Sequence, residues 1–202
     1  IATGAHPKKL GLDREEKLTG AGVSYCATCD GAFFRNATVA VAGGGDTAVS
    51  DALYLSRFAK KVYVIHRRDK LRAAETLQRA MFTTHNIEFV GCSVRIGLIG
   101  EDEQEGLTVK STLDGSQREI PVEGLFIAVG VEPNTELFAD KVSTDEAGRI
   151  ITDKHMQTDI SGVYAAGDVR DTPLRQVVTA AADGAIAATS AIEYIMKQAE
   201  RK

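Results

Sequence analysis

A short β-rich run that leads through a glycine turn into a helical pattern constrains the fold of this 202-residue chain more than any other feature. The run Thr38-Val-Ala-Val-Ala42 is followed by three glycines, and helix-forming residues extend from Asp46 to about Phe58. This order of strand, glycine turn and helix is typical of the first half of a βαβ unit. The chain is therefore expected to contain a parallel sheet with helices packed against it.

The small residues of this turn match a dinucleotide-binding fingerprint. Gly43 stands where a tight turn is needed, Gly45 where a pyrophosphate approaches the backbone, and Ala48 where helix and strand must pack closely. Asp46 and Thr47 would open the helix whose positive N-terminal end holds the phosphates. A tight turn that binds nothing is the alternative, and the strand before it and the helix after it favour the nucleotide site.

The end of the second β-rich run, Lys61 to Ile65, indicates which nucleotide is bound. An NAD site has an acidic residue about 20 residues beyond the glycines. This chain has His66-Arg67-Arg68 there, and guanidinium groups form charge-assisted hydrogen bonds with a 2′-phosphate. Arg72 would lie one turn further along a helix expected from Lys70 to about Phe82, so NADPH is favoured over NADH. A solvated charge run is the alternative interpretation.

Further strands are expected at residues 87–90, 94–99, 107–113 and 124–129, with the acidic stretch 100–106 as a solvated hairpin turn. Gly130-Val-Glu-Pro133 suggests a domain boundary. Beyond it we expect a hairpin near residues 148–152 and a final helix over about residues 174–198.

Charge and hydropathy exclude several classes of protein. A net charge of -4 and a pI near 5.6 argue against nucleic-acid binding, which depends on an excess of Lys and Arg. The sequence has no apolar run of about 18 residues and no secretory signal pattern, so no membrane association and a cytoplasmic location are expected.

The cysteine pair Cys26-Ala-Thr-Cys29 has a spacing that permits either redox chemistry or metal binding. Zinc needs two more ligands, and Cys92 and the scattered histidines offer no pair at a typical spacing, so no metal site is expected. Redox chemistry is favoured, with two inert buried thiols as the alternative. Asp30 follows at once and is a candidate proton donor and acceptor, because reduction of a disulfide must protonate a leaving thiolate.

The chain resembles bacterial low-molecular-weight thioredoxin reductases from end to end. The resemblance rests on motifs in the family's order: Cys26-Ala-Thr-Cys29-Asp30, Gly43-Gly-Gly-Asp-Thr-Ala48, His66-Arg-Arg-Asp69, Ala165-Ala-Gly-Asp168 and Arg175-Gln-Val-Val178. It implies an α/β fold with a three-layer, Rossmann-like NADPH-binding domain, a parallel sheet plus a β-meander, at residues 10–130. Residues 131–202 would be the C-terminal segment of a discontinuous FAD-binding domain, and residues 1–9 the end of its first half with a hinge.

The resemblance also implies site residues and a reaction. Gly167 and Asp168 would bind the ribityl chain of FAD, and Arg175, Gln176 and Val177 at the start of the final helix would contact the flavin. Electrons would pass from NADPH through FAD to the Cys26–Cys29 disulfide and on to thioredoxin, with Cys29 nearer the flavin and Cys26 attacking the substrate. The full-length form would be a homodimer.

The family's first glycine-rich FAD motif has no counterpart in a sequence that starts at Ile1, so the chain as given is expected to be a fragment that holds FAD weakly or not at all. Two alternatives stay open. The chain could be an isolated NADPH-binding module, or part of the reductase flavoprotein of an alkyl hydroperoxide reductase system. A relative that uses ferredoxin would lack the arginines.

Overall fold

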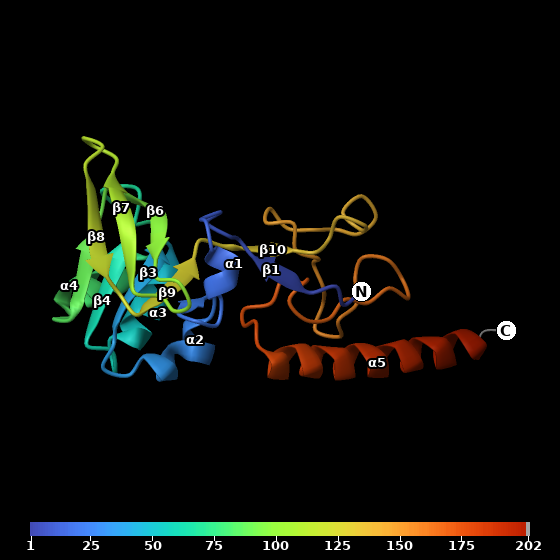
Figure 1. The fold of residues 1–202 in the computed structure, drawn as a ribbon. Coiled ribbons are helices and arrows are strands. Elements are labelled where there is room, and N and C mark those ends of the chain that lie inside the picture. Colours follow the sequence, from blue (N-terminus) through green and yellow to red (C-terminus); the bar gives the residue numbers. More distant parts are fainter. Residues whose placement is uncertain (201–202) are drawn as a thin grey trace. The chain divides into compact units, whose positions relative to one another are not determined.

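The computed structural model describes residues 1–200, which form two compact units (Figure 1). One unit is Lys9–Gly130. The other combines Ile1–Lys8 with the chain from Val131 onward. Each unit is described separately.

The Lys9–Gly130 unit is built on a five-stranded parallel sheet with strand order β2-β9-β3-β4-β5. Its strands are β2 (Val23–Ser24), β3 (Thr38–Gly43), β4 (Lys61–Ile65), β5 (Ile87–Val90) and β9 (Gly124–Ala128). The central strand β3 is buried on both faces, which explains why its sequence is an almost continuous apolar run.

Successive residues of β3 serve two different hydrophobic cores, because side chains alternate across a strand. Val39 and Val41 pack in a core with Leu55 and Met81 of the helices α3 (Asp46–Leu55) and α4 (Glu75–Thr83). Ala40 and Ala42 join a second core on the opposite face. That face is covered by an antiparallel β-meander of β6 (Ser93–Ile99), β7 (Gly106–Ser111) and β8 (Gln117–Pro121). The three-layer α/β arrangement expected from the sequence is confirmed.

This unit also contains three short helices: α1 (Glu15–Leu18), α2 (Ala27–Asp30) and the 3-10 helix η1 (Gly31–Phe34).

The 100–106 turn is only partly solvated, since Gln104 is 3% exposed and its N–H donates to the Ala21 carbonyl. The expectation of a wholly solvated turn was therefore wrong at that residue.

The helix expected from Lys70 begins five positions later, at Glu75. Two hydrogen bonds hold the preceding segment out of the helix: Arg72 N–H donates to the Gly44 carbonyl (2.7 Å), and Ala74 N–H donates to Asp46 Oδ1 (2.7 Å). The expectation that Arg72 lies one helical turn beyond Arg68 was therefore wrong, although the segment still returns to the glycine turn.

In the other unit, β1 (Ala5–Pro7) pairs antiparallel with β10 (Val131–Pro133), and Val142, Ile150, Ala165 and Val169 form a small core. The hairpin expected near residues 148–152 contributes an isolated bridge between Thr144 and Ile150. The final helix α5 (Val177–Ala199) starts three residues later than expected. Among residues 1–200, no helix is both long and apolar enough to cross a lipid bilayer.

Candidate active site

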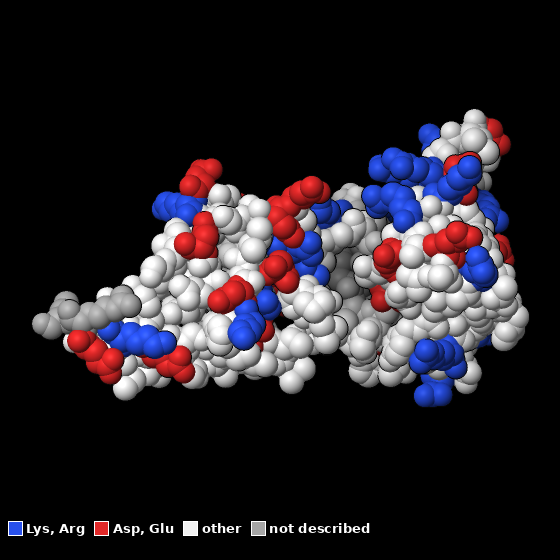
Figure 2. All heavy atoms as spheres, turned by 180° about the vertical axis from the view of Figure 1, so that it is seen from behind, with Lys and Arg blue, Asp and Glu red and all other residues white. Residues whose placement is uncertain are grey.

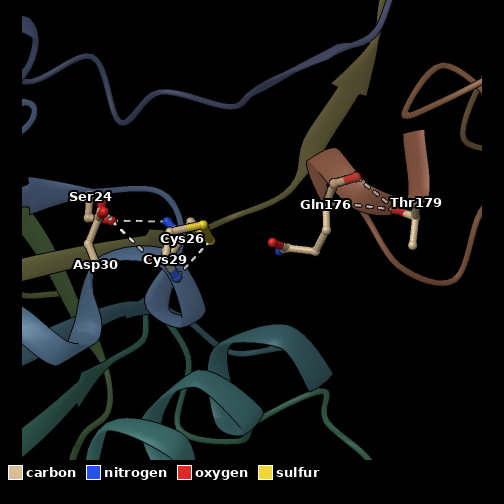
Figure 3. Close-up of a disulfide and its surroundings, with 6 residues drawn as sticks. All are labelled: Ser24, Cys26, Cys29, Asp30, Gln176 and Thr179. Atoms are coloured by element: carbon tan, nitrogen blue, oxygen red, sulfur yellow. Dashed lines mark hydrogen bonds between the residues drawn. A yellow bond between two sulfur atoms is a disulfide. The ribbon is translucent and has the colours of Figure 1, made fainter. Parts of the chain in front are cut away.

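Cys26 and Cys29 form a disulfide at the start of α2 (Figure 3). Strand β2 ends at Ser24, so the pair stands at the carboxyl edge of the parallel sheet, where the loops of such folds carry functional residues. Cys29 is exposed and Cys26 half-buried, whereas Cys92 is a free, half-buried cysteine. The two sulfurs that the sequence pairs are therefore bonded and reachable from solvent.

A serine hydroxyl joins the disulfide to the neighbouring carboxylate. Ser24 Oγ donates to Asp30 Oδ2 at 2.6 Å and accepts the N–H of Cys26 at 3.0 Å (Figure 3). Asp30 is thus held beside the cysteines by a side chain that the sequence reasoning missed. The sequence shows only a serine two positions before the first cysteine, and its burial is visible only in the structure.

A buried carboxylate supports the residue next to Cys26. Glu15 is 2% exposed and accepts hydrogen bonds from Leu10 N–H (2.9 Å), Leu12 N–H (3.0 Å) and Tyr25 Oη–H (2.7 Å). Burial opposes ionisation of Glu15, but these hydrogen bonds together lower its pKa. Burial and the bond to Glu15 raise the pKa of Tyr25 to about 12.

The glycine turn is closed to a side chain at Gly43 and Gly44 and open at Gly45. A Cβ at Gly43 would lie 2.4 Å from the Ala128 carbonyl oxygen and 2.7 Å from Ala48 Cβ, so glycine is required for β3 to pack against β9 and α3. At Gly45 a Cβ would meet nothing within 4 Å. The turn thus leaves its backbone open at Gly45, just before the N-terminus of α3, as a phosphate cradle requires.

A cleft of about 270 Å³ lies at this turn, and basic residues dominate its polar lining. Its lining consists of Lys9, Leu10, Gly43, Gly44, His66, Arg67, Arg72, Arg95, Ala128 and Val129. Figure 2 shows Lys and Arg side chains grouped in the upper part of this unit. Although the whole chain is acidic, this cleft is suited to an anion.

Within residues 1–200, the arginines of this region have no acidic partner. In the described part of the chain, the arginines that pair with carboxylates are Arg14, Arg79, Arg149 and Arg170. Arg67, Arg68 and Arg72 are exposed, and only the first and third line the cleft. Their charges remain available to a phosphate.

His66 forms part of the cleft wall. It is 6% exposed, its ring packs so tightly against Gly44 that a Cβ there would lie 2.4 Å from Nδ1, and its Nε2 has no partner among residues 1–200. Burial, followed by the charges of Arg72 and Arg67, lowers its pKa, so the ring is neutral at pH 7. At the start of α3, Asp46 and Thr47 are both exposed. The Asp46 carboxylate accepts the Ala74 N–H.

The other unit gathers the remaining expected residues around the start of α5. Gly167 adopts a φ of 80°, and its N–H donates to Asp183 Oδ2 of α5, which also pairs with Arg170 at 3.0 Å. Asp168 follows in the same turn, half-buried. This turn therefore packs directly on the final helix.

The first residues of α5 form a capped N-terminus. The Thr179 hydroxyl accepts the Gln176 N–H at 3.1 Å and donates to the Gln176 carbonyl at 2.8 Å (Figure 3). Val177 is 88% exposed, and Arg175 Nε is buried with no partner among residues 1–200. An unpaired buried donor beside a helix N-terminus fits an anionic or polar group such as a flavin ring.

Comparison with known proteins identifies the family. The sequence model of the Pyridine nucleotide-disulphide oxidoreductase family matches residues 1–184. The chain is 48% identical over 196 residues to a thioredoxin reductase of Listeria monocytogenes, covering 96% of this chain and 61% of that protein. It is 46% identical over 201 residues to a thioredoxin reductase of Peptoclostridium acidaminophilum, covering 96% and 64%.

A solved structure agrees with this assignment. The thioredoxin reductase of Streptococcus pyogenes is 46% identical to this chain and superposes on it with a TM-score of 0.92. The matched region is 98% of this chain and 65% of the Streptococcus pyogenes chain. The chain therefore spans less than two thirds of the length of these relatives. On the family match, the chain belongs to the pyridine nucleotide-disulphide oxidoreductases, and it is thioredoxin reductase-like over almost its whole length.

Proposed function

We propose that this chain belongs to an NADPH-dependent thioredoxin reductase, in which residues 10–130 bind NADPH and carry the redox disulfide. Residues 131–202 would contribute to FAD binding. The observation that carries the proposal is a solvent-accessible disulfide, held beside Asp30, in the same compact unit as a basic cleft at a glycine turn. The similarity to thioredoxin reductases supports thioredoxin as the electron acceptor. We further propose that the full-length protein is a cytoplasmic homodimer.

On this proposal the glycine turn and the arginines that follow β4 have defined tasks. Gly43 and Gly45 admit the pyrophosphate, the N-terminus of α3 faces it, and Arg67, Arg68 and Arg72 bind the 2′-phosphate. When bound, FAD would accept two electrons as a hydride from NADPH and pass them to the disulfide. Gly167, Asp168 and the capped start of α5 would hold it.

At the disulfide, two electrons and two protons break the S–S bond and leave two thiols. Asp30 would give a proton to a cysteine sulfur and take it back, and the Ser24 hydroxyl would hold the Asp30 carboxylate in place. By the family's pattern, the Cys26 thiolate then attacks the disulfide of thioredoxin, and Cys29 resolves the mixed disulfide. The products are oxidised Cys26–Cys29 and reduced thioredoxin.

The test is NADPH oxidation by the full-length protein loaded with FAD, with oxidised thioredoxin as acceptor. Turnover that disappears in Cys26→Ser is expected. Turnover with a peroxiredoxin-type acceptor but not with thioredoxin would favour the hydroperoxide reductase system. Activity with NADPH that persists in Cys26→Ser would contradict the disulfide route.

A further inference from the structure

Arg95 brings a half-buried positive charge to the nucleotide cleft from a part of the fold outside the fingerprint. It belongs to β6 of the meander, and its Nη1 donates to the Ile65 carbonyl at the end of β4 (3.2 Å). The residue also lines the cleft with His66 and Arg67. A side chain from the second sheet therefore reaches the carboxyl end of the strand that carries the arginines.

The guanidinium of Arg95 is incompletely satisfied. Its Nε is buried without a hydrogen-bond partner in the described residues, and Arg95 is not among the arginines there that pair with carboxylates. Burial, and then the charge of Arg67, lowers its pKa. The Glu15 carboxylate opposes this shift, but it forms no ion pair with Arg95 within residues 1–200. A partly buried cation that lacks an ion-pair partner is stabilised when an anion binds beside it.

A second unsatisfied donor or acceptor lies in the same wall. His66 is 6% exposed, and its Nε2 also lacks a partner within residues 1–200. Its ring is fixed against Gly44 of the glycine turn. Buried polar atoms are rarely left unpaired, so two of them lining one basic cleft point to a polar ligand that completes both.

We infer that Arg95 binds a phosphate oxygen of the dinucleotide, as an anion-binding residue in addition to Arg67, Arg68 and Arg72. The inference rests on the proposed NADPH site. The phosphate has two sources, the 2′-phosphate near the end of β4 and the pyrophosphate at the glycine turn. In either position Arg95 would reach the nucleotide from the meander face of the sheet, which is opposite the face that α3 and α4 cover.

The test is calorimetric titration of the 202-residue chain with NADPH and NADH, using Arg95→Gln, Arg95→Lys and the matched control Arg118→Gln. Arg118 is an exposed arginine of the same meander that does not line the cleft. We expect Arg95→Gln to weaken binding about tenfold or more, equivalent to roughly 1.4 kcal/mol. Arg118→Gln should bind like wild type.

The two sources give different patterns. Equal loss for NADPH and NADH places Arg95 at the pyrophosphate, whereas loss for NADPH alone places it at the 2′-phosphate. Wild-type affinity of Arg95→Gln for both nucleotides overturns the inference and leaves the proposed function intact. A wild-type chain that binds neither nucleotide overturns the proposed function and the inference with it.

A second measurement guards against a variant that fails to fold. In the wild-type chain, the Nε–H resonance of Arg95, assigned by its loss in Arg95→Lys, should shift on addition of NADP⁺. Its solvent exchange should also slow. An unchanged Arg95 resonance, while backbone signals of Gly43–Gly45 shift, would overturn the inference even without the glutamine variant.

Discussion

The phenolic hydroxyl of Tyr25 donates a 2.7 Å hydrogen bond to the buried carboxylate of Glu15. This contact fixes the residue before Cys26 to the segment that enters the Lys9–Gly130 unit, because Glu15 also holds the N–H groups of Leu10 and Leu12. Tyr25→Phe should lower the free energy of unfolding by about 1.5–3 kcal/mol, the range for a hydrogen bond to a charged group. Urea denaturation of wild type and Tyr25→Phe at pH 7 measures this difference in the free energy of unfolding. Tyr63→Phe, which leaves these bonds untouched, is the control.

The same carboxylate predicts a pH dependence. The pKa of Glu15 is lowered from 4.5 in the folded chain, so its stabilising contribution is complete above pH 4.5 and is lost as the pH falls through the folded value. Glu15→Gln should therefore be less stable than wild type at pH 7, with the difference shrinking steadily below pH 4.5. A difference that is constant between pH 7 and pH 3 would exclude this role for the ionised carboxylate.

Asp30 is expected to control proton exchange at the disulfide. Asp30→Asn keeps the shape of the side chain but removes its ability to take up a proton. Reduction of thioredoxin by the full-length protein should slow by about 100-fold or more. Ser24→Ala removes the hydroxyl that holds the Asp30 carboxylate and the Cys26 N–H but leaves the carboxylate itself, so it should have a smaller effect. The exposed Asp13→Asn should have none. An Asp30→Asn enzyme of normal rate would remove Asp30 from the mechanism.

Thiol counting distinguishes the redox pair from the remaining cysteine. Mild oxidation should consume two thiols, dithiothreitol should restore both, and Cys92 should titrate unchanged throughout. In Cys26→Ser and Cys29→Ser the reversible loss should disappear, and metal analysis should find no stoichiometric zinc. Persistent loss of two thiols in Cys26→Ser would disprove the pairing.

Nucleotide preference follows from the arginines at the end of β4. The chain should bind NADPH at least about tenfold more tightly than NADH, or roughly 1.4 kcal/mol. The double variant Arg67→Ala, Arg68→Ala should narrow this ratio by weakening NADPH, while Arg57→Ala, exposed beyond the end of α3, should leave it unchanged. Equal affinities in wild type would contradict the assignment to NADPH.

The two glycines of the fingerprint should respond differently to alanine. Gly43→Ala forces a methyl group against the Ala128 carbonyl and should destabilise the fold by about 1–3 kcal/mol. Gly45→Ala meets no neighbour, so its stability cost should stay below about 1 kcal/mol, while its affinity for NADPH falls. Thermal unfolding with and without nucleotide separates the two effects.

The parts of the fold that follow local patterns were predictable from sequence. The apolar run of β3, the glycine turn and α3 form one continuous signal, and the structure has them within a few residues of the expected positions. Strand β8 was missed because it is polar and exposed except at Ile120, as befits an edge strand. The false helical start at Lys70 had another cause, since hydrogen bonds to Gly44 and Asp46 are invisible to local propensity.

The site was predictable only where a motif defines it. The disulfide, the turn and the arginines were named from their spacing, and their roles in binding and catalysis stay predictions. Arg95 lies in no motif, and Ser24 lies in the stretch Gly22-Val-Ser-Tyr25 without a role that the sequence assigns. Their importance comes from convergence in space: Ser24 bridges Asp30 and Cys26, and Arg95 reaches the cleft from a different sheet.

The segment between β4 and α4 is anchored by its backbone and not by its arginine side chains. Arg72 N–H is bonded to the Gly44 carbonyl, and Ala74 N–H is bonded to Asp46. Exchange of the guanidinium groups for acidic side chains would leave both anchors in place. If the arginines select the nucleotide as we propose, the cofactor preference of this scaffold would change with these side chains alone, without remodelling of the loop.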